Sequence, residues 1–236
     1  MSEEPGQSAP PHEPALPGQA PASASARRPV ARWLQILFFA AIVRPFLALF
    51  IGLRVRGGEH LPEHDPFILI ANHTSHLDTV ALLGLLPLAR LHRVRPVAAA
   101  DYFLRSRLRR WFSTTLFNIL PVDRHHVTKG SNPLSDMLAA LHAGESLLLF
   151  PAGTRGGEDG AGHFLPGIAH LAETAPEVPI VPAFLVNLGR SLPKGTFLPV
   201  PFFAEVRIGP AVHVTGTRAE ILAGLEAAVL ALRGEK

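Results

Sequence analysis

From residue 54 onward, short apolar runs of strand length alternate with longer segments whose apolar residues recur at helical spacing. Such alternation is typical of a parallel or mixed β-sheet that is covered by helices on both faces. Strands are expected at 53–56, 67–71, 95–99, 147–150, 179–186, 203–208 and 211–214, and helices at 76–86, 101–113, 131–143, 167–175 and 217–233. We therefore predict a single α/β domain over residues 54–236.

One polar loop, from Ala71 to Asp78, follows the apolar run 67–70 and carries two side chains suited to proton transfer. A neutral imidazole such as that of His73 accepts a proton near pH 7, and a carboxylate on its other nitrogen fixes the tautomer. Positions five apart diverge by roughly 140° on a helix, so the pair forms only if His73 lies in the loop and Asp78 in the first helical turn. Ser75, as an N-cap, favours that arrangement. The alternative is that Asp78 merely complements the helix dipole.

Three further stretches follow in the sequence and resemble, together with this loop, one known family. The four stretches are Asn72-His73-x-x-x-x-Asp78, Pro121-Val122-Asp123-Arg124, Phe150-Pro151-Ala152-Gly153-Thr154-Arg155 and Val178-Pro179-Ile180-Val181-Pro182-Ala183. In order and spacing they resemble the motifs of the glycerolipid acyltransferases, the 1-acylglycerol-3-phosphate O-acyltransferases, over about residues 30–215. One departure is Ala152, because the family usually has glutamate there, at a position associated with the acyl acceptor.

The resemblance implies an O-acyltransferase with a glycerol-3-phosphate acyltransferase-like fold. In this interpretation His73 is the general base and Asp78 orients it, while the substrate-binding residues are Asn72, Arg124, Gly153, Thr154 and Arg155. The acyl group would pass from acyl-CoA or acyl carrier protein to the free hydroxyl of a lysophospholipid, with lysophosphatidic acid giving phosphatidic acid. No metal or cofactor is required, because the thioester arrives activated. Ala152 leaves two alternatives, a different lyso-lipid acceptor or a non-catalytic lipid-binding homologue.

A metallohydrolase is a further alternative, since His73, His76 and Asp78 are residue types that bind zinc. Their His-x-x-His-x-Asp pattern lacks the His-x-His-x-Asp-His frame of the metallo-β-lactamase type, and no other ligands cluster in the sequence.

The first 53 residues differ in composition from the α/β domain. Residues 1–28 are rich in Pro, Ala, Ser and Gly and are expected to be a disordered tail. Residues 29–53 are apolar, but Arg44-Pro45 divides them into pieces shorter than the ~20 residues that a membrane span needs. We predict a membrane-associated helical hairpin in one leaflet with Arg44 at the headgroups, and the preceding arginines favour the cytoplasmic face of the inner (plasma) membrane. The alternative is a hairpin that caps the domain core.

Composition narrows the remaining classes of partner. With 47% apolar residues the chain is not disordered as a whole, and without cysteine it has neither disulfides nor thiolate nucleophiles. The net charge of +3 favours anionic partners. The basic segment 104–112 suits a membrane surface or the phosphates of a carrier, or is simply a solvated face. No nucleic-acid motif is present, so the expected partners are lysophospholipid, acyl thioester, membrane lipid and an acyl carrier protein.

Overall fold

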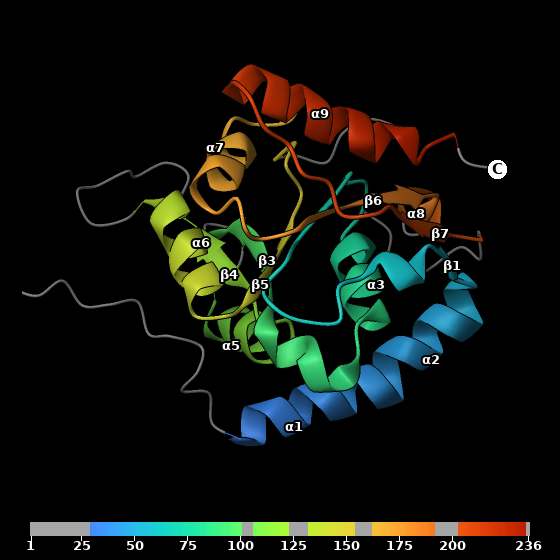
Figure 1. Ribbon diagram of the computed structural model, residues 1–236. Coiled ribbons are helices and arrows are strands. Elements are labelled where there is room, and N and C mark those ends of the chain that lie inside the picture. The colour runs from blue at the N-terminus through green and yellow to red at the C-terminus, as the bar shows by residue number, and fades with distance from the viewer. Residues whose placement is uncertain (1–28, 101–105, 123–131, 154–161, 192–202, 235–236) are drawn as a thin grey trace, which may run out of the picture.

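The computed structural model describes residues 29–100, 106–122, 132–153, 162–191 and 203–234. These residues form a seven-stranded sheet in the order β1-β7-β6-β2-β5-β3-β4 (Figure 1). Its strands are β1 (Arg54–Arg56), β2 (Ile68–Ala71), β3 (Val94–Ala99), β4 (Leu120–Val122), β5 (Ser146–Leu149), β6 (Ile180–Val186) and β7 (Glu205–Ile208). Strands β2 to β6 are mutually parallel, whereas β7 runs antiparallel to β6 and parallel to β1. The sheet is therefore mixed, as predicted.

Helices cover both faces of the sheet (Figure 1). One face packs against α6 (Pro133–His142), α7 (Gly167–Thr174) and α9 (Arg218–Ala231). The other packs against α3 (Leu77–Leu85), the 3-10 helix η5 (Leu88–Arg93) and the N-terminal helix. Along β2 the side chains alternate between the two cores: Ile68 and Ile70 join the first, Leu69 and Ala71 the second. This double burial explains why the strands read as continuous apolar runs.

The elements near the sheet edges differ most from the sequence prediction. Strand β4 was not predicted, because it is only three residues long and contains a proline. The predicted strand at 211–214 is reduced to one bridge, in which Val212 N–H donates to Ile180 O at 2.8 Å. Helix α5 (Arg107–Leu116) begins after its N-cap Ser106, and the predicted helical residues 101–105 lie outside the described part. Two short helices, η4 (Gly58–His60) and α8 (Leu188–Ser191), were also not predicted.

The N-terminal segment is one helix, so the predicted break at Arg44-Pro45 is wrong. No loop interrupts it: α1 (Pro29–Phe38), the π-helical turn η2 (Phe39–Val43), α2 (Arg44–Phe46) and a second π-helical turn, η3 (Leu47–Ile51), follow one another directly. Pro45 has no N–H to donate, and the π turn before it widens the helix where the proline ring would otherwise meet a carbonyl. The helix ends at Gly52, whose φ of 61° is left-handed.

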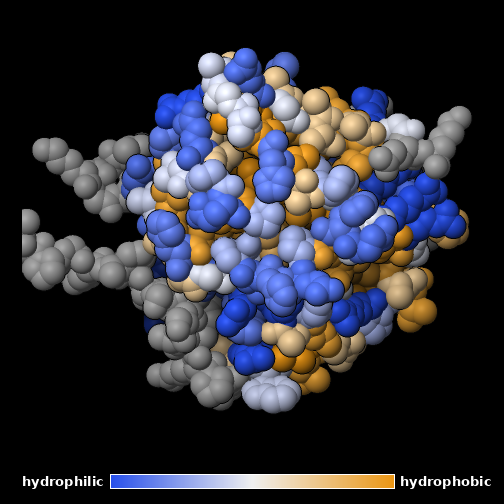
Figure 2. Space-filling model, viewed as in Figure 1, coloured by the Kyte–Doolittle hydropathy of each residue, from blue (hydrophilic) through white to orange (hydrophobic). Residues whose placement is uncertain are grey.

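This helix lies along the domain with one face buried and one face outward. Phe39, Val43, Leu47 and Ile51 are buried in the core. The outward face is apolar as well, and carries the exposed side chains of Trp33, Leu34, Leu37, Ile42, Leu49 and Phe50. Figure 2 shows hydrophobic side chains gathered along the lower rim of the molecule, where Figure 1 places this helix. Residues 31–51 are long and apolar enough to cross a membrane.

Arg44 was predicted to lie at the lipid headgroups, but its side chain is instead bonded within the domain. Its Nε donates to Gly84 O at 3.2 Å and its Nη2 to Leu86 O at 2.8 Å. These carbonyls belong to the last turn of α3, which lacks further helical donors and favours a cation. Arg44 therefore joins the N-terminal helix to the helix that follows the polar loop.

Candidate active site

The sheet topology brings the first three sequence motifs to one edge. Strands β2, β4 and β5 are parallel, so their carboxyl ends and the loops that follow them lie on the same side. The loop after β2 carries His73, and the turn after β5 carries Ala152 and Gly153. Arg124, Thr154 and Arg155 belong to the second and third motifs but lie outside the described residues.

His73 and Asp78 form a hydrogen-bonded pair, in the arrangement that their spacing requires. His73 lies in the loop and Asp78 in the first turn of α3, and His73 Nδ1 is 2.8 Å from Asp78 Oδ2. The same oxygen accepts the backbone N–H of Thr74 at 2.6 Å and of Ser75 at 2.8 Å. Because Oδ2 is an acceptor here, Nδ1 must be the donor, and in the neutral imidazole Nε2 then keeps its lone pair. Asp78 is fully buried, whereas the His73 side chain is 19% exposed.

Ser75 acts at the start of α3, one position earlier than a regular N-cap. The helix begins at Leu77, so His76 precedes it and makes no side-chain cap bond. Ser75 Oγ instead accepts the Leu77 N–H at 3.3 Å. The predicted capping role therefore holds in substance, because the hydroxyl satisfies a first-turn donor.

Phe150 packs against one face of the His73 imidazole. Its ring stacks on the His73 ring, with centroids 4.1 Å apart and an interplanar angle of 21°. Phe150 ends the apolar run of β5, which neighbours β2 in the sheet. Stacking and the Asp78 bond together restrain the ring of His73. The sequence alone does not reveal the stacking, because Phe150 lies 77 positions after His73.

Asn72 has a clear structural partner. Its side-chain amide donates to Leu185 O at 3.0 Å and its carbonyl accepts Leu185 N–H at 2.7 Å, so the polar loop is tied to β6. Asn72 is buried, and these bonds position the residue next to His73. Its predicted contact with substrate stays a prediction.

The turn after β5 is tight and carries a small side chain where the resemblance leads one to expect glutamate. Gly153 has a φ of 72°, and its N–H donates to Phe150 O at 2.9 Å. The left-handed conformation favours glycine there. Ala152 is half-buried, and a Cβ added to Gly162 would come within 3.1 Å of the Ala152 Cβ. The backbone at Gly162 therefore passes close beside the position of the missing carboxylate.

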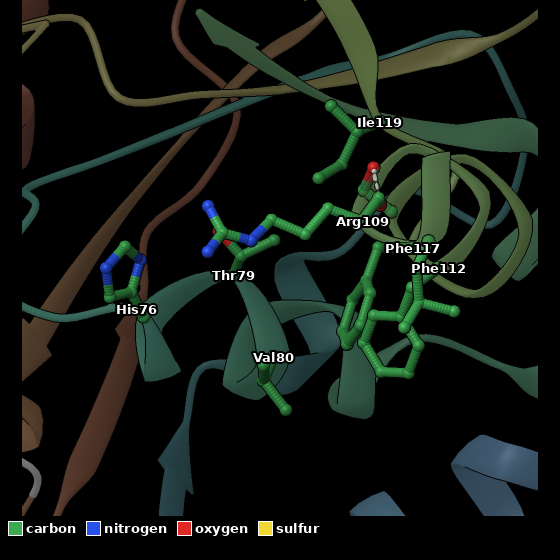
Figure 3. Close-up of a pocket in the computed structure, with 9 residues that line it drawn as sticks. His76, Thr79, Val80, Arg109, Phe112, Phe117 and Ile119 are labelled. Atoms are coloured by element: carbon green, nitrogen blue, oxygen red, sulfur yellow. Dashed lines mark hydrogen bonds between the residues drawn. The ribbon is translucent and has the colours of Figure 1, made fainter. Parts of the chain in front are cut away.

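An apolar groove of about 530 Å³ opens between α3 and α5 (Figure 3). Its lining residues come from the first turns of α3, from α5 and from the segment after α5: His76, Thr79, Val80, Leu108, Arg109, Phe112, Ser113, Phe117 and Ile119. His76 lies three residues after His73. Figure 3 shows the Arg109 guanidinium directed toward His76 and Thr79, with Phe112 and Phe117 side by side farther along the groove.

The floor of the groove is an aromatic cluster shared with the N-terminal helix. The Phe112 and Phe117 rings lie 5.5 Å apart, and each meets Phe38 edge-on at about the same separation (5.9 and 5.8 Å). Such edge contacts stabilise aromatic pairs beyond their buried area. The groove therefore lies between the polar loop and the helix with the apolar outward face.

Comparison with known proteins assigns the family. A family model described as Acyltransferase matches residues 52–186, more than half of the chain. The chain belongs to the acyltransferase family. The 1-acyl-sn-glycerol-3-phosphate acyltransferase of Pseudomonas aeruginosa is 27% identical over 215 residues, which cover 82% of this chain and 79% of that protein.

Other members of the acyltransferase family match over a shorter region or in fold. The human 1-acyl-sn-glycerol-3-phosphate acyltransferase alpha is 30% identical over 135 residues, 56% of this chain and 44% of that protein. The chain thus spans about half the length of such mammalian relatives. The crystal structure of the 1-acyl-sn-glycerophosphate (LPA) acyltransferase PlsC from Thermotoga maritima matches with a TM-score of 0.66 and 20% identity, covering 90% of this chain and 86% of that one. This likeness shows a shared fold.

Within the ranges that the structure describes, no three His, Asp or Glu side chains are grouped to hold a metal ion. His73 Nδ1 is already bonded to Asp78, so these two residues face each other rather than a common centre.

Proposed function

We propose that this chain transfers a fatty acyl group from acyl-CoA or acyl carrier protein to the free hydroxyl of a lysophospholipid, with lysophosphatidic acid as the acceptor and phosphatidic acid as the product. The observation that carries the proposal is the His73–Asp78 pair beside an apolar groove, in a member of the acyltransferase family. The names of the bacterial and human relatives support the choice of acceptor.

The pair supplies the proton transfer that the reaction needs. His73 Nε2 takes the proton from the acceptor hydroxyl as its oxygen attacks the thioester carbonyl carbon, while Asp78 stabilises the imidazolium. The tetrahedral intermediate collapses with cleavage of the carbon–sulfur bond. The departing thiolate then takes the proton from His73, so an ester and a free thiol are formed.

The remaining predicted site residues would hold the acceptor. Arg124 and Arg155 offer planar guanidinium groups that bind phosphate in bidentate fashion, and Thr154 offers a hydroxyl donor. In the sequence, Thr154 comes directly after Gly153, whereas Arg124 and Arg155 each come two positions after the last described residue of β4 and of the turn after β5. Gly153 keeps the turn tight enough for such an approach.

The groove between α3 and α5 is the proposed site of the acyl chain. Its volume of about 530 Å³ lies within the range of small-molecule sites, and apolar side chains dominate its lining. Arg109 and His76 are placed at the end nearest the loop, where the polar thioester would lie.

The apolar helix is the proposed membrane attachment, at the cytoplasmic face. Because Phe39, Val43, Leu47 and Ile51 are committed to the domain core, only the outward face is available to lipid. This favours a helix lying in the plane of the interface over one that crosses the bilayer.

The test is acyl transfer from labelled acyl-CoA and from acyl carrier protein to a panel of lyso-lipids in vesicles. His73→Ala should abolish product, whereas the control His142→Ala changes an exposed histidine at the end of α6 and should not. The product identifies the acceptor. If folded, vesicle-bound wild type transfers to no acceptor from either donor, the chain is instead a lipid-binding member of the family, with Ala152 as the reason.

A further inference from the structure

A second hollow, of about 420 Å³, shares no lining residue with the acyl groove. It is formed where the first turns of α1 meet η5 and the loop that precedes β2. Unlike the groove, it is lined by charged and polar side chains: Arg32 from α1, Glu63 and Asp65 from the loop, and Arg90, His92 and Arg93 from η5. Nothing in the proposed acyl transfer uses these residues.

The acidic and basic groups in this hollow do not balance locally. Arg90 is occupied, because its Nη2 lies 2.8 Å from Asp65 Oδ1, and the same oxygen also accepts the Ser146 hydroxyl at 2.6 Å. Within the described ranges, Arg32 and Arg93 have no ion-pair partner, and both are exposed. Two guanidinium groups without an ion-pair partner among the described residues therefore line one hollow, together with the exposed carboxylate of Glu63.

The pKa of His92 is affected by the positive charges in this hollow. Burial lowers the pKa of His92 below its usual range, and the positive charges of Arg32 and Arg93 lower it further, against the weaker opposite effect of Asp65. His64 is the other titratable lining group, and it is exposed. The hollow therefore disfavours a further cation and favours an anion.

The position of the hollow suggests the source of that anion. Gln35, buried on α1, donates to Leu116 O at 3.1 Å and to Leu91 O at 3.5 Å, so α1 is held against η5 and α5. On the same turns, Trp33 and Leu37 are exposed by 70% and 64%. A helix that rests on lipid through these side chains places Arg32 at the level of the headgroups.

We propose that the hollow between α1 and η5 binds a phosphate group, supplied by the headgroup of an anionic phospholipid, through Arg32 and Arg93. It is separate from the proposed phosphate site of the acceptor at the edge of the sheet. The choice of lipid as the source rests on the proposed membrane attachment, but not on acyl transfer.

The test follows the imidazole resonances of His92 by NMR across pH, in full-length protein. Three additions are compared: inorganic phosphate, vesicles of phosphatidylcholine, and vesicles of equal parts phosphatidylcholine and phosphatidylglycerol. A phosphate held by Arg32 and Arg93 should raise the pKa of His92 by about one pH unit. Among the three additions, only the anionic vesicles should produce this rise in the pKa of His92. In the Arg93→Gln variant, the pKa of His92 should be the same with and without these vesicles.

Arg107→Gln is the matched control, because Arg107 is an exposed arginine on neighbouring α5 but outside the hollow. Each arginine change should weaken binding to anionic vesicles about fivefold, while only the change in the hollow abolishes the response of His92. A response to phosphate alone would still support the site and make free phosphate its ligand. No response of His92 to either phosphate or anionic vesicles, or an equal loss of the His92 response in the Arg93→Gln and Arg107→Gln variants, would overturn the proposal.

Discussion

Nδ1 of His73 and Oδ2 of Asp78 lie 2.8 Å apart, and two backbone N–H groups converge on the same carboxylate oxygen. One buried carboxylate therefore holds the loop and selects the imidazole tautomer at once. Any change at Asp78 is expected to alter both.

Asp78→Asn should lower kcat for acyl transfer by roughly a thousandfold or more, because an amide can donate to Nδ1 and select the wrong tautomer. It should also lower the free energy of unfolding by about 1–3 kcal/mol, since the backbone N–H groups of Thr74 and Ser75 lose a charged acceptor. Kinetics and denaturant unfolding measure the two effects. Asp136→Asn, in the first turn of α6, is the control and should leave kcat near wild type.

Phe150→Leu should reduce kcat by about three- to tenfold, because the stacked ring that restrains His73 is lost while apolar volume is largely kept. Phe150→Tyr should retain most activity. Steady-state kinetics of both variants at saturating donor separate this orienting effect from substrate binding. Equal activity of the leucine variant and wild type would show that Asp78 alone positions the imidazole.

Phe112→Ala should shift acyl preference toward longer chains, because it opens the groove at the end away from His76. Each additional methylene buried there strengthens donor binding about fourfold. Competition between acyl donors of different length provides the measurement. Trp111→Ala removes a neighbouring exposed aromatic that does not line the groove, and it should leave the preference unchanged.

Arg44→Met should lower the free energy of unfolding by about 2 kcal/mol, because it leaves the carbonyls of Gly84 and Leu86 without their charged donor. Vesicle binding should be unaffected, in contrast to what a headgroup position would give. Arg54→Met, at an exposed strand position, serves as control. If the variant were as stable as wild type but bound vesicles weakly, Arg44 would instead act at the lipid headgroups.

Acidification should destabilise the protein through His92. Its pKa is lowered in the folded state, so the unfolded chain takes up the proton first, near pH 6.5, and stability falls as the pH drops further toward the folded value. Because His92 is only partly buried, solvent screening keeps its contribution well below the ~1.4 kcal/mol per pH unit of a fully shifted group. His92→Gln should flatten this part of the curve of unfolding free energy against pH, whereas His142→Gln should not.

Much of the fold was predictable because both cores leave a periodic signal. Strands buried on two faces give apolar runs such as 67–70, and the helices between them keep helical spacing. The His73–Asp78 contact also followed from local geometry, since a five-residue separation permits only a loop-to-helix pairing. The stacking of Phe150 and the aromatic floor of the groove depend on packing between distant segments, which no local pattern encodes.

The continuity of the N-terminal helix through Arg44-Pro45 was missed for a different physical reason. Its buried residues Gln35, Phe39, Val43, Leu47 and Ile51 recur every four positions. In a regular α-helix of ~100° per residue, that spacing drifts by about 40° per step, so the first and last would point almost in opposite directions. A regular α-helix with a period of ~3.6 residues therefore gives these residues no single buried face. Pro45, in turn, indicated a break in the helix.

The two π turns make this spacing work, because each takes up one residue more than an α turn. Both faces of the helix are apolar, so side-chain chemistry does not decide which face is buried. The number of residues between the buried positions decides it. Deleting one residue between Phe39 and Ile51 would turn the rest of the helix by roughly 100° about its axis. The buried side chain of Ile51 would then be turned out of the core, although no apolar residue had been made polar.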